Sequence, residues 1–180
     1  MDKLVDDWNV KTAYDIICNN VSNYNKMTPY EKSSFSAAIY DRIFKLPDSM
    51  CFTGYMSMDA FQAKRKNKLT YDHCFSPRTG LHAMLKYNVE CLNNIHSFTE
   101  EFISLVMKTV GVTKAQNRSV VFQSKDGIYS YPELTLTKYN SFNWIHKNGT
   151  RDPKWEKSFP LSDQIPEWFT QFEIDHLIRE

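Results

Sequence analysis

Residues 69 to 80 read LTYDHCFSPRTG, and this stretch decides how the rest of the chain is interpreted. It opens with strand-forming residues, bends at Ser76-Pro77, and continues into a segment where Leu81, Met84 and Leu85 recur at helical spacing. The pattern predicts a strand over 68–74 and a helix over 79–87. A short strand that leads into a helix indicates the mixed α+β class.

Further helices are predicted on both sides of this stretch. Thr28 opens one of them, with Glu31 in its first turn as a capping partner. Ser97 and Glu100 form a second capping pattern, and the helix that follows them is expected to end at Gly111. The predicted helices span residues 8–24, 28–46, 57–66, 79–87, 97–111, 113–121 and 166–178, and a further short strand is predicted at 51–55.

The length and composition fit one domain. The chain has 180 residues, of which 42% are hydrophobic and 14% aromatic, so it can bury a core of its own. We therefore expect an α+β, mainly helical single domain over residues 1–180. Its parts are a helical N-terminal part (1–50), a catalytic core (51–123) and a loop-rich, aromatic-rich C-terminal part (124–180).

The charge balance excludes proteins that bind nucleic acid through overall positive charge. The 22 Lys and Arg residues nearly match the 21 Asp and Glu residues, which leaves a net charge of +1. Any contact with nucleic acid must therefore come from a local basic patch.

The cysteines and the N-terminus indicate a protein of the cytoplasm. No two cysteines form a C-x-x-C pair, which argues against a zinc ribbon or a thioredoxin motif and fits a reducing compartment. The N-terminus is acidic where a signal peptide would be basic and then apolar, and no apolar run approaches the ~18 residues of a membrane span. The four cysteines are Cys18, Cys51, Cys74 and Cys91.

Asp72 and His73 are the residues best suited to chemistry. They lie side by side where the predicted strand ends, just before the turn that contains Arg78. Neighbours in a regular strand point to opposite faces, so the two can serve one site only where the strand ends or bends. A carboxylate is a ligand for Mg²⁺ or Mn²⁺, and an imidazole can take a proton from an attacking water. The alternative is structural, with Asp72 capping a turn and His73 bonded to backbone.

The stretch from Leu69 to Val121 resembles the HNH, or His-Me finger, endonucleases, also called the ββα-metal class. Small phage-encoded members carry an Asp-His pair, a helix, and then a T-x-x-x-N pattern at the start of another helix. Here the second pattern is Thr113 to Asn117, with Gln116 where the class usually has Glu. The resemblance implies a small ββα-metal-like element embedded in the domain.

The resemblance also implies a metal-dependent hydrolysis of DNA. His73 would be the general base, and Asp72 and Asn117 would hold Mg²⁺ or Mn²⁺ against the scissile phosphate. Arg78, and also Arg118, would contact phosphate oxygens. Because of the Gln at position 116, other residues stay open as the second metal ligand, namely Asn93, Asn94 and His96.

Two further features indicate nucleic-acid binding. Four cations, Lys64, Arg65, Lys66 and Lys68, directly precede the predicted strand and could hold a phosphate backbone, although such clusters are more often solvated loops. Aromatic residues interleaved with Lys and Arg fill the C-terminal part, among them Tyr129, Tyr131, Tyr139, Phe142, Trp144 and Trp155. They are interpreted either as a stacking surface for single-stranded DNA or as core.

Two alternatives to a DNA endonuclease stay open. One is a phage or bacterial protein that binds nucleic acid or a host protein without catalysis, in which case replacing His73 changes nothing. The other is an endoribonuclease, which side-by-side cleavage of matched DNA and RNA would reveal. The sequence gives no oligomeric state.

Overall fold

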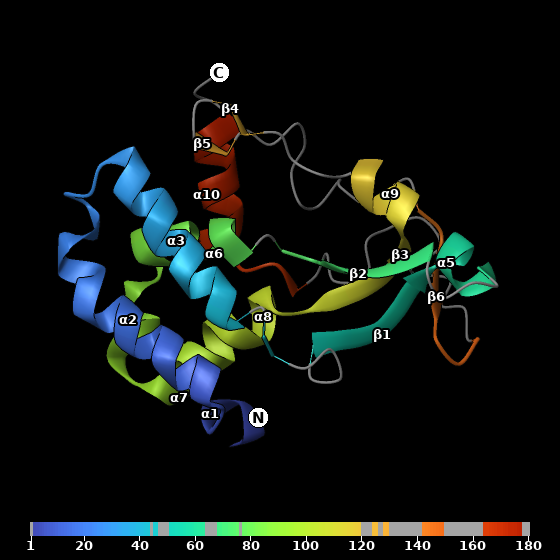
Figure 1. Ribbon diagram of the computed structural model, residues 1–180, viewed down its shortest axis with the longest axis horizontal. Coiled ribbons are helices and arrows are strands. Elements are labelled where there is room, and N and C mark those ends of the chain that lie inside the picture. Colours follow the sequence, from blue (N-terminus) through green and yellow to red (C-terminus); the bar gives the residue numbers. More distant parts are fainter. Residues whose placement is uncertain are drawn as a thin grey trace.

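A computed structural model describes residues 2–43, 45–46, 51–63, 68–75, 77–119, 124–125, 128–129, 142–149 and 164–177. Most of the helices gather on one side, and a four-stranded sheet extends from them to the other side (Figure 1). The predicted α+β, mainly helical class is confirmed. No helix in these residues is long and apolar enough to cross a membrane.

The first long helices begin as the sequence predicts, and the second of them ends at Ile43, three residues before the predicted end. Asp7 caps α2 by accepting a hydrogen bond of 2.8 Å from the Asn9 N–H. At α3 the Glu31 carboxylate accepts from the Thr28 N–H at 2.7 Å, and the Glu31 N–H donates to the Thr28 hydroxyl at 3.3 Å. This reciprocal pair satisfies N–H groups that have no partner inside the helix. The N-terminal helices are α1 (Asp2–Val5), α2 (Trp8–Tyr24) and α3 (Pro29–Ile43).

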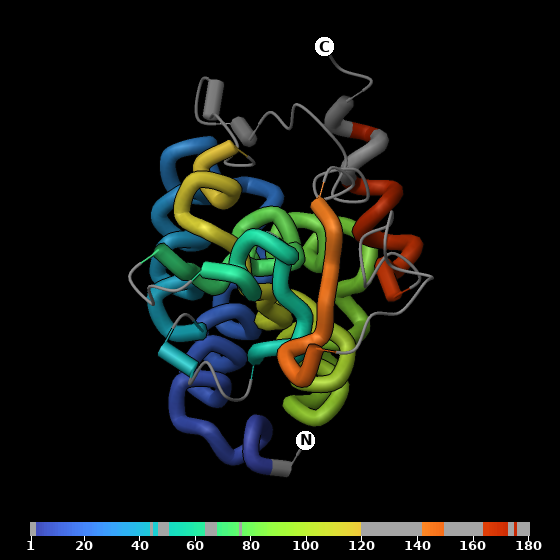
Figure 2. Tube along the Cα trace, turned by 90° about the vertical axis from the view of Figure 1, so that its right-hand side faces the viewer, coloured from blue at the N-terminus to red at the C-terminus, as the bar shows by residue number. Residues whose placement is uncertain are grey.

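The sheet combines parallel and antiparallel strands in the order β2-β3-β1-β6. β3 runs parallel to β1 and antiparallel to β2, and β6, which lies beside β1 (Figure 2), runs antiparallel to it. The β1–β3 register is irregular around Gly54, whose φ of 90° is one that side-chain-bearing residues rarely adopt. The strands of this sheet are β1 (Phe52–Ser57), β2 (Leu69–His73), β3 (Thr109–Thr113) and β6 (Trp144–His146). Two short strands, β4 (Ser124–Lys125) and β5 (Ile128–Tyr129), pair with each other.

The predicted helix over 97–111 is wrong at both ends. Asn94, not Ser97, is the cap, and its side chain accepts from the Ser97 N–H at 2.9 Å. The helical segment ends near Val106, and Gly111 lies in the middle of β3 instead of closing a helix. The alternation of Val110 and Val112, which face the core, overrides the capping pattern. The segment consists of η2 (Val89–Asn93), α7 (Ile95–Phe98), the π-helical turn η3 (Thr99–Ile103) and α8 (Ser104–Val106).

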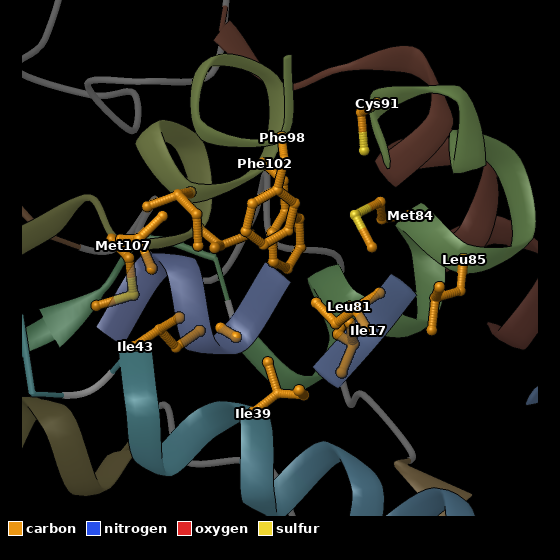
Figure 3. Close-up of a cluster of buried hydrophobic side chains, with 14 of the residues drawn as sticks. Ile17, Ile39, Ile43, Leu81, Met84, Leu85, Cys91, Phe98, Phe102 and Met107 are labelled. Carbon is orange, nitrogen blue, oxygen red and sulfur yellow. The ribbon is translucent and has the colours of Figure 1, made fainter. Parts of the chain in front are cut away.

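Two hydrophobic clusters hold the fold together. The first lies between the helices, where Ile17, Ile39 and Leu81 pack around the stacked rings of Phe98 and Phe102 (Figure 3). The second joins one face of the sheet to α6 and α10, and it includes Cys74 and Phe169. Cys74 is fully buried in this second cluster. The remaining helices are α5 (Met58–Gln62), α6 (Pro77–Tyr87), α9 (Lys114–Ser119) and α10 (Glu167–Leu177).

Candidate active site

The Asp72-His73 pair lies at the end of β2, as predicted, and the chain then turns into α6. The ladder with β3 continues through both residues, with Asp72 opposite Val110 and His73 opposite Thr109. Directly opposite residues share a face of the sheet, and Val110 is on the face that α6 and α10 cover. Asp72 is therefore on the helix-covered face and His73 on the other one. Both side chains are partly exposed.

Tyr40 brings His73 and Arg78 together. This residue comes from α3, and its ring packs edge-on against the His73 imidazole with 6.5 Å between centroids. The Arg78 guanidinium, in the first turn of α6, lies over the same ring at 5.2 Å. Burial raises the pKa of Tyr40, the positive charge of Arg78 opposes that shift, and the negative charge of Asp72 adds to it. Imidazole, phenol, guanidinium and carboxylate thus gather where β2, α3 and α6 meet.

A buried hydroxyl lies directly beside His73. Cys74 donates its N–H to the Lys108 carbonyl at 2.8 Å, so the neighbouring His73–Thr109 pair is a narrow pair without ladder hydrogen bonds. In such pairs the side chains are closest, with Cα atoms about 4.5 Å apart. Within the described residues the Thr109 hydroxyl has no hydrogen-bond partner, although only 4% of the residue is exposed. An unsatisfied hydroxyl at this position is unusual in a folded protein.

Asn117 lies at the opposite end of the sheet. β1 and β3 are parallel, and both end where α5 and α9 begin. β2 is antiparallel to β3, so it ends, with Asp72 and His73, at the opposite end of the strands (Figure 1). Thr113, which precedes α9, is three residues along β3 from the partner of Asp72, or about 10 Å at ~3.4 Å per residue. The predicted pairing of Asp72 and Asn117 around one metal ion is therefore not formed.

Gln116 fixes α9 at the end of the sheet where α5 begins, through hydrogen bonds of its side chain. Its side-chain oxygen accepts from the Ser57 hydroxyl at 2.7 Å and from the Thr113 N–H at 3.0 Å. Its side-chain nitrogen donates to Asp59 at 3.0 Å. The Gln116 N–H in turn donates to the Thr113 hydroxyl at 3.1 Å, so these two residues form the capping box of α9. The Gln116 side chain thus ties α9 to α5.

The other candidate metal ligands do not reach the Asp72-His73 pair either. The Asn94 side chain is used as the cap of α7, and Asn93 and His96 are exposed on η2 and α7. These elements pack with α2 and α6 in the helical body. Among the described residues, no group of three His, Cys, Asp or Glu side chains is placed to hold a metal ion.

Of the five residues predicted to contact nucleic acid outside the Asp72-His73 region, two are among the described residues and three are not. Lys68 and Arg118 are brought to the same end of the sheet, because Leu69 is opposite Thr113 and α9 follows at once. Both side chains are exposed. Three further predicted contacts, Lys64, Arg65 and Lys66, lie outside the described residues.

The C-terminal aromatic residues that are described belong to the core. Phe142 is 9% exposed and Trp144 is 2% exposed, and both pack in the cluster between the sheet and α10. Of the two interpretations of these residues, the structural one is confirmed for this pair. Tyr131, Tyr139 and Trp155 lie outside the described residues, as does the Tyr129 side chain.

Comparison with known proteins adds no relative. No family model, curated protein or solved structure matched the chain.

Proposed function

We propose that the protein is an endonuclease in which His73 is the general base and Arg78 holds the scissile phosphate. The observation that carries the proposal is the convergence of an imidazole and a guanidinium on the ring of Tyr40, at the end of a strand and the start of a helix. Cleaving a phosphodiester bond requires a group that takes a proton from the attacking oxygen and a cation that stabilises the charge on phosphate.

Each residue has a separate task in this proposal. The neutral His73 imidazole takes the proton from the attacking oxygen. The Arg78 guanidinium pairs with two phosphate oxygens, whose negative charge grows in the transition state. The Tyr40 phenol, whose pKa burial raises above its ordinary value, is protonated at neutral pH and is the group that gives a proton to the departing oxygen.

The Mg²⁺ or Mn²⁺ ion that the resemblance implies does not fit the predicted ligand set. Asp72 is near the site, but Asn117 is at the other end of the sheet. Two ligands of one Mg²⁺ ion each approach it to about 2.1 Å, which these two residues cannot do together. We therefore assign no step to a metal ion, and metal dependence is an outcome of the experiment.

The test is cleavage by the purified protein of matched DNA and RNA, each single- and double-stranded, with Mg²⁺ or with EDTA. His73→Ala is compared with His96→Ala, which removes an exposed histidine of α7. Loss of general-base catalysis typically costs about 10²–10⁴ in rate, so His73→Ala should lose nearly all cleavage and His96→Ala should keep it. Cleavage of no substrate, or equal cleavage by both variants, would contradict the proposal.

A further inference from the structure

An exposed aromatic pair lies on the same face of the sheet as His73. Tyr71, two residues before His73 in β2, is 47% exposed, and its ring meets the ring of Phe52 edge-on at 5.0 Å. Opposite Tyr71 is Gly111, where a Cβ atom would come within 2.9 Å of the Met56 Cβ. The glycine lets β1 and β3 approach closely beneath the tyrosine. The result is an exposed tyrosine ring that is braced edge-on by Phe52 and supported by the backbone of β3.

Cations lie at this surface and at the end of β2 away from His73. The Lys147 ammonium lies over the Phe52 ring at 5.9 Å. Lys68, Lys114 and Arg118 are exposed at the α9 end, and within the described part of the chain none of them is in an ion pair. Lys114 and Arg118 are four residues apart and therefore share one side of α9.

The carboxylates near these cations either form hydrogen bonds of their own or lie on other elements or the other face of the sheet. Asp59 lies beside the α9 end, and its carboxylate accepts the hydrogen bond from Gln116. Asp72 is on the opposite face of β2, and Asp41 is on α3 close enough to influence Tyr40. The positive charge of Arg78 lies over the same Tyr40 ring against which His73 packs. From Lys68 to Arg78, cations therefore accompany the exposed aromatic surface over about 13 Å of β2 at ~3.4 Å per residue.

We infer that this face of the sheet binds single-stranded RNA, with an unpaired base stacked on Tyr71 and the phosphates following the cations toward His73. The inference rests on the proposed function and names its substrate. A polyanion matches the charge, and an exposed ring flanked by cations stacks bases that are free of a partner strand. In a duplex the base faces are covered, so the tyrosine would have nothing to stack on.

RNA fits the site better than DNA because it brings its own nucleophile. His73 takes the proton of a 2′-hydroxyl, the 2′-oxygen bonds to phosphorus, and the bond from phosphorus to the 5′-oxygen breaks. The 5′-oxygen takes the phenol proton of Tyr40, which then regains a proton from the His73 imidazolium. The products are a 2′,3′-cyclic phosphate and a 5′-hydroxyl. These steps use the groups gathered around Tyr40, so they do not require a metal ion held by a second ligand.

Binding is tested separately from cleavage. A fluorescein-labelled RNA strand of about ten nucleotides, within the usual site size of such surfaces, is titrated with the His73→Ala protein, and anisotropy gives the dissociation constant. The same protein with Tyr71→Ala should bind at least about fivefold more weakly, because stacking on one aromatic residue accounts for that much or more. Tyr71→Trp should bind as well as the parent, since stacking is retained. The matched control is Tyr30→Ala, which removes a tyrosine that is 81% exposed on α3.

Each result supports or overturns the inference. Weaker binding by Tyr71→Ala alone, together with preference for single-stranded RNA over the matched duplex RNA and the matched DNA strand, supports it. Equal binding by Tyr71→Ala and Tyr30→Ala, or tighter binding of duplex or of DNA, overturns it. If Tyr71 is needed for RNA binding but the wild-type protein cleaves nothing, the surface stands and the proposed function fails. If cleavage depends on His73 but not on Tyr71, the proposed function stands and the surface fails.

Discussion

Asp72 and His73 are consecutive in β2, yet the continuous ladder with β3 places them on opposite faces of the sheet. His73 shares its face with Thr109 and Tyr71, whereas Asp72 shares its face with Val110 in the core beneath α6 and α10. The two residues form one motif in the sequence, but in the structure they face different surroundings. His73 lies on the face with the exposed Tyr71, and the charge of Asp72 acts on Tyr40, whose ring packs against His73.

Neighbouring residues of α9 separate the structural role of this helix from a metal-binding one. Asn117→Ala should leave cleavage unchanged within about twofold, because Asn117 lies away from Asp72 and His73. Gln116→Ala should lower the free energy of unfolding by roughly 1–3 kcal/mol, since it removes the partner of Ser57, Thr113 and Asp59. Urea unfolding and a cleavage assay on both variants measure this. A large loss of activity in Asn117→Ala alone would restore the metal-ligand assignment.

Tyr40→Phe tests the phenol as proton donor. The change keeps the ring under Arg78 and against His73 but removes the hydroxyl, so the substrate should bind as before and react more slowly. We expect kcat to fall by about 10²-fold or more with KM nearly unchanged. Steady-state cleavage with RNA and DNA substrates gives both constants. A change in KM alone would show that Tyr40 binds substrate and takes no part in proton transfer.

A buried polar network between α2, α3 and α6 should contribute to stability. The Ser36 hydroxyl donates its one proton to the Lys32 carbonyl at 2.7 Å, so it accepts from His82 Nε2 at 3.0 Å. His82 Nδ1 then accepts the hydrogen bond from the Tyr24 hydroxyl.

Tyr24→Phe should therefore leave a ring nitrogen without its partner and destabilise the fold by roughly 1–3 kcal/mol. Equilibrium urea unfolding measures the loss, with Tyr30→Phe on the surface of α3 as the control. Equal midpoints for the two variants would mean that the network adds nothing.

The link between α6 and α10 should depend on pH. Hydrogen bonds from Tyr87, then from Gln171 and Lys86, hold the pKa of Asp175 well below its ordinary value. A carboxyl whose pKa is lower in the folded state stabilises the fold above its unfolded pKa of about 3.9 and loses that contribution as the pH falls.

Asp175→Asn should remove this part of the acid dependence. Melting temperatures of wild type and variant, measured from pH 7 down to pH 2, should differ by a constant amount above about pH 5 and approach each other only below about pH 4. Parallel curves over the whole range would contradict the assignment.

Local patterns predicted most of the fold. The caps at Thr28, Ser57 and Thr113 carry their information in a few adjacent residues, and the helices that start there are formed. The prediction that Gly111 ends a helix is wrong. A glycine after a helical pattern often marks a helix end, whereas Gly111 lies in β3 where β1 and β3 approach closely.

The candidate site could be predicted only in part. The sequence singles out His73 and Arg78, but Tyr40 joins them from a helix about thirty residues earlier, and no local spacing marks such a contact. Tyr71 and His73 are two residues apart in the predicted strand over 68–74. Because side chains alternate between the two faces of a strand, the sequence alone could have placed both residues on one face. Asn117 was misplaced because the direction of β3 is a property of the whole sheet.

Single-turnover cleavage by His73→Ala tests the central claim most directly. Excess purified protein is mixed with an end-labelled RNA strand in EDTA and again in Mg²⁺, beside wild type and His96→Ala. We predict that wild type and His96→Ala cleave the strand to a 2′,3′-cyclic phosphate in both buffers, and that His73→Ala loses at least about 10² in rate. Wild-type cleavage that persists in His73→Ala, or no cleavage by wild type, would contradict the assignment of His73 as the general base of an endonuclease.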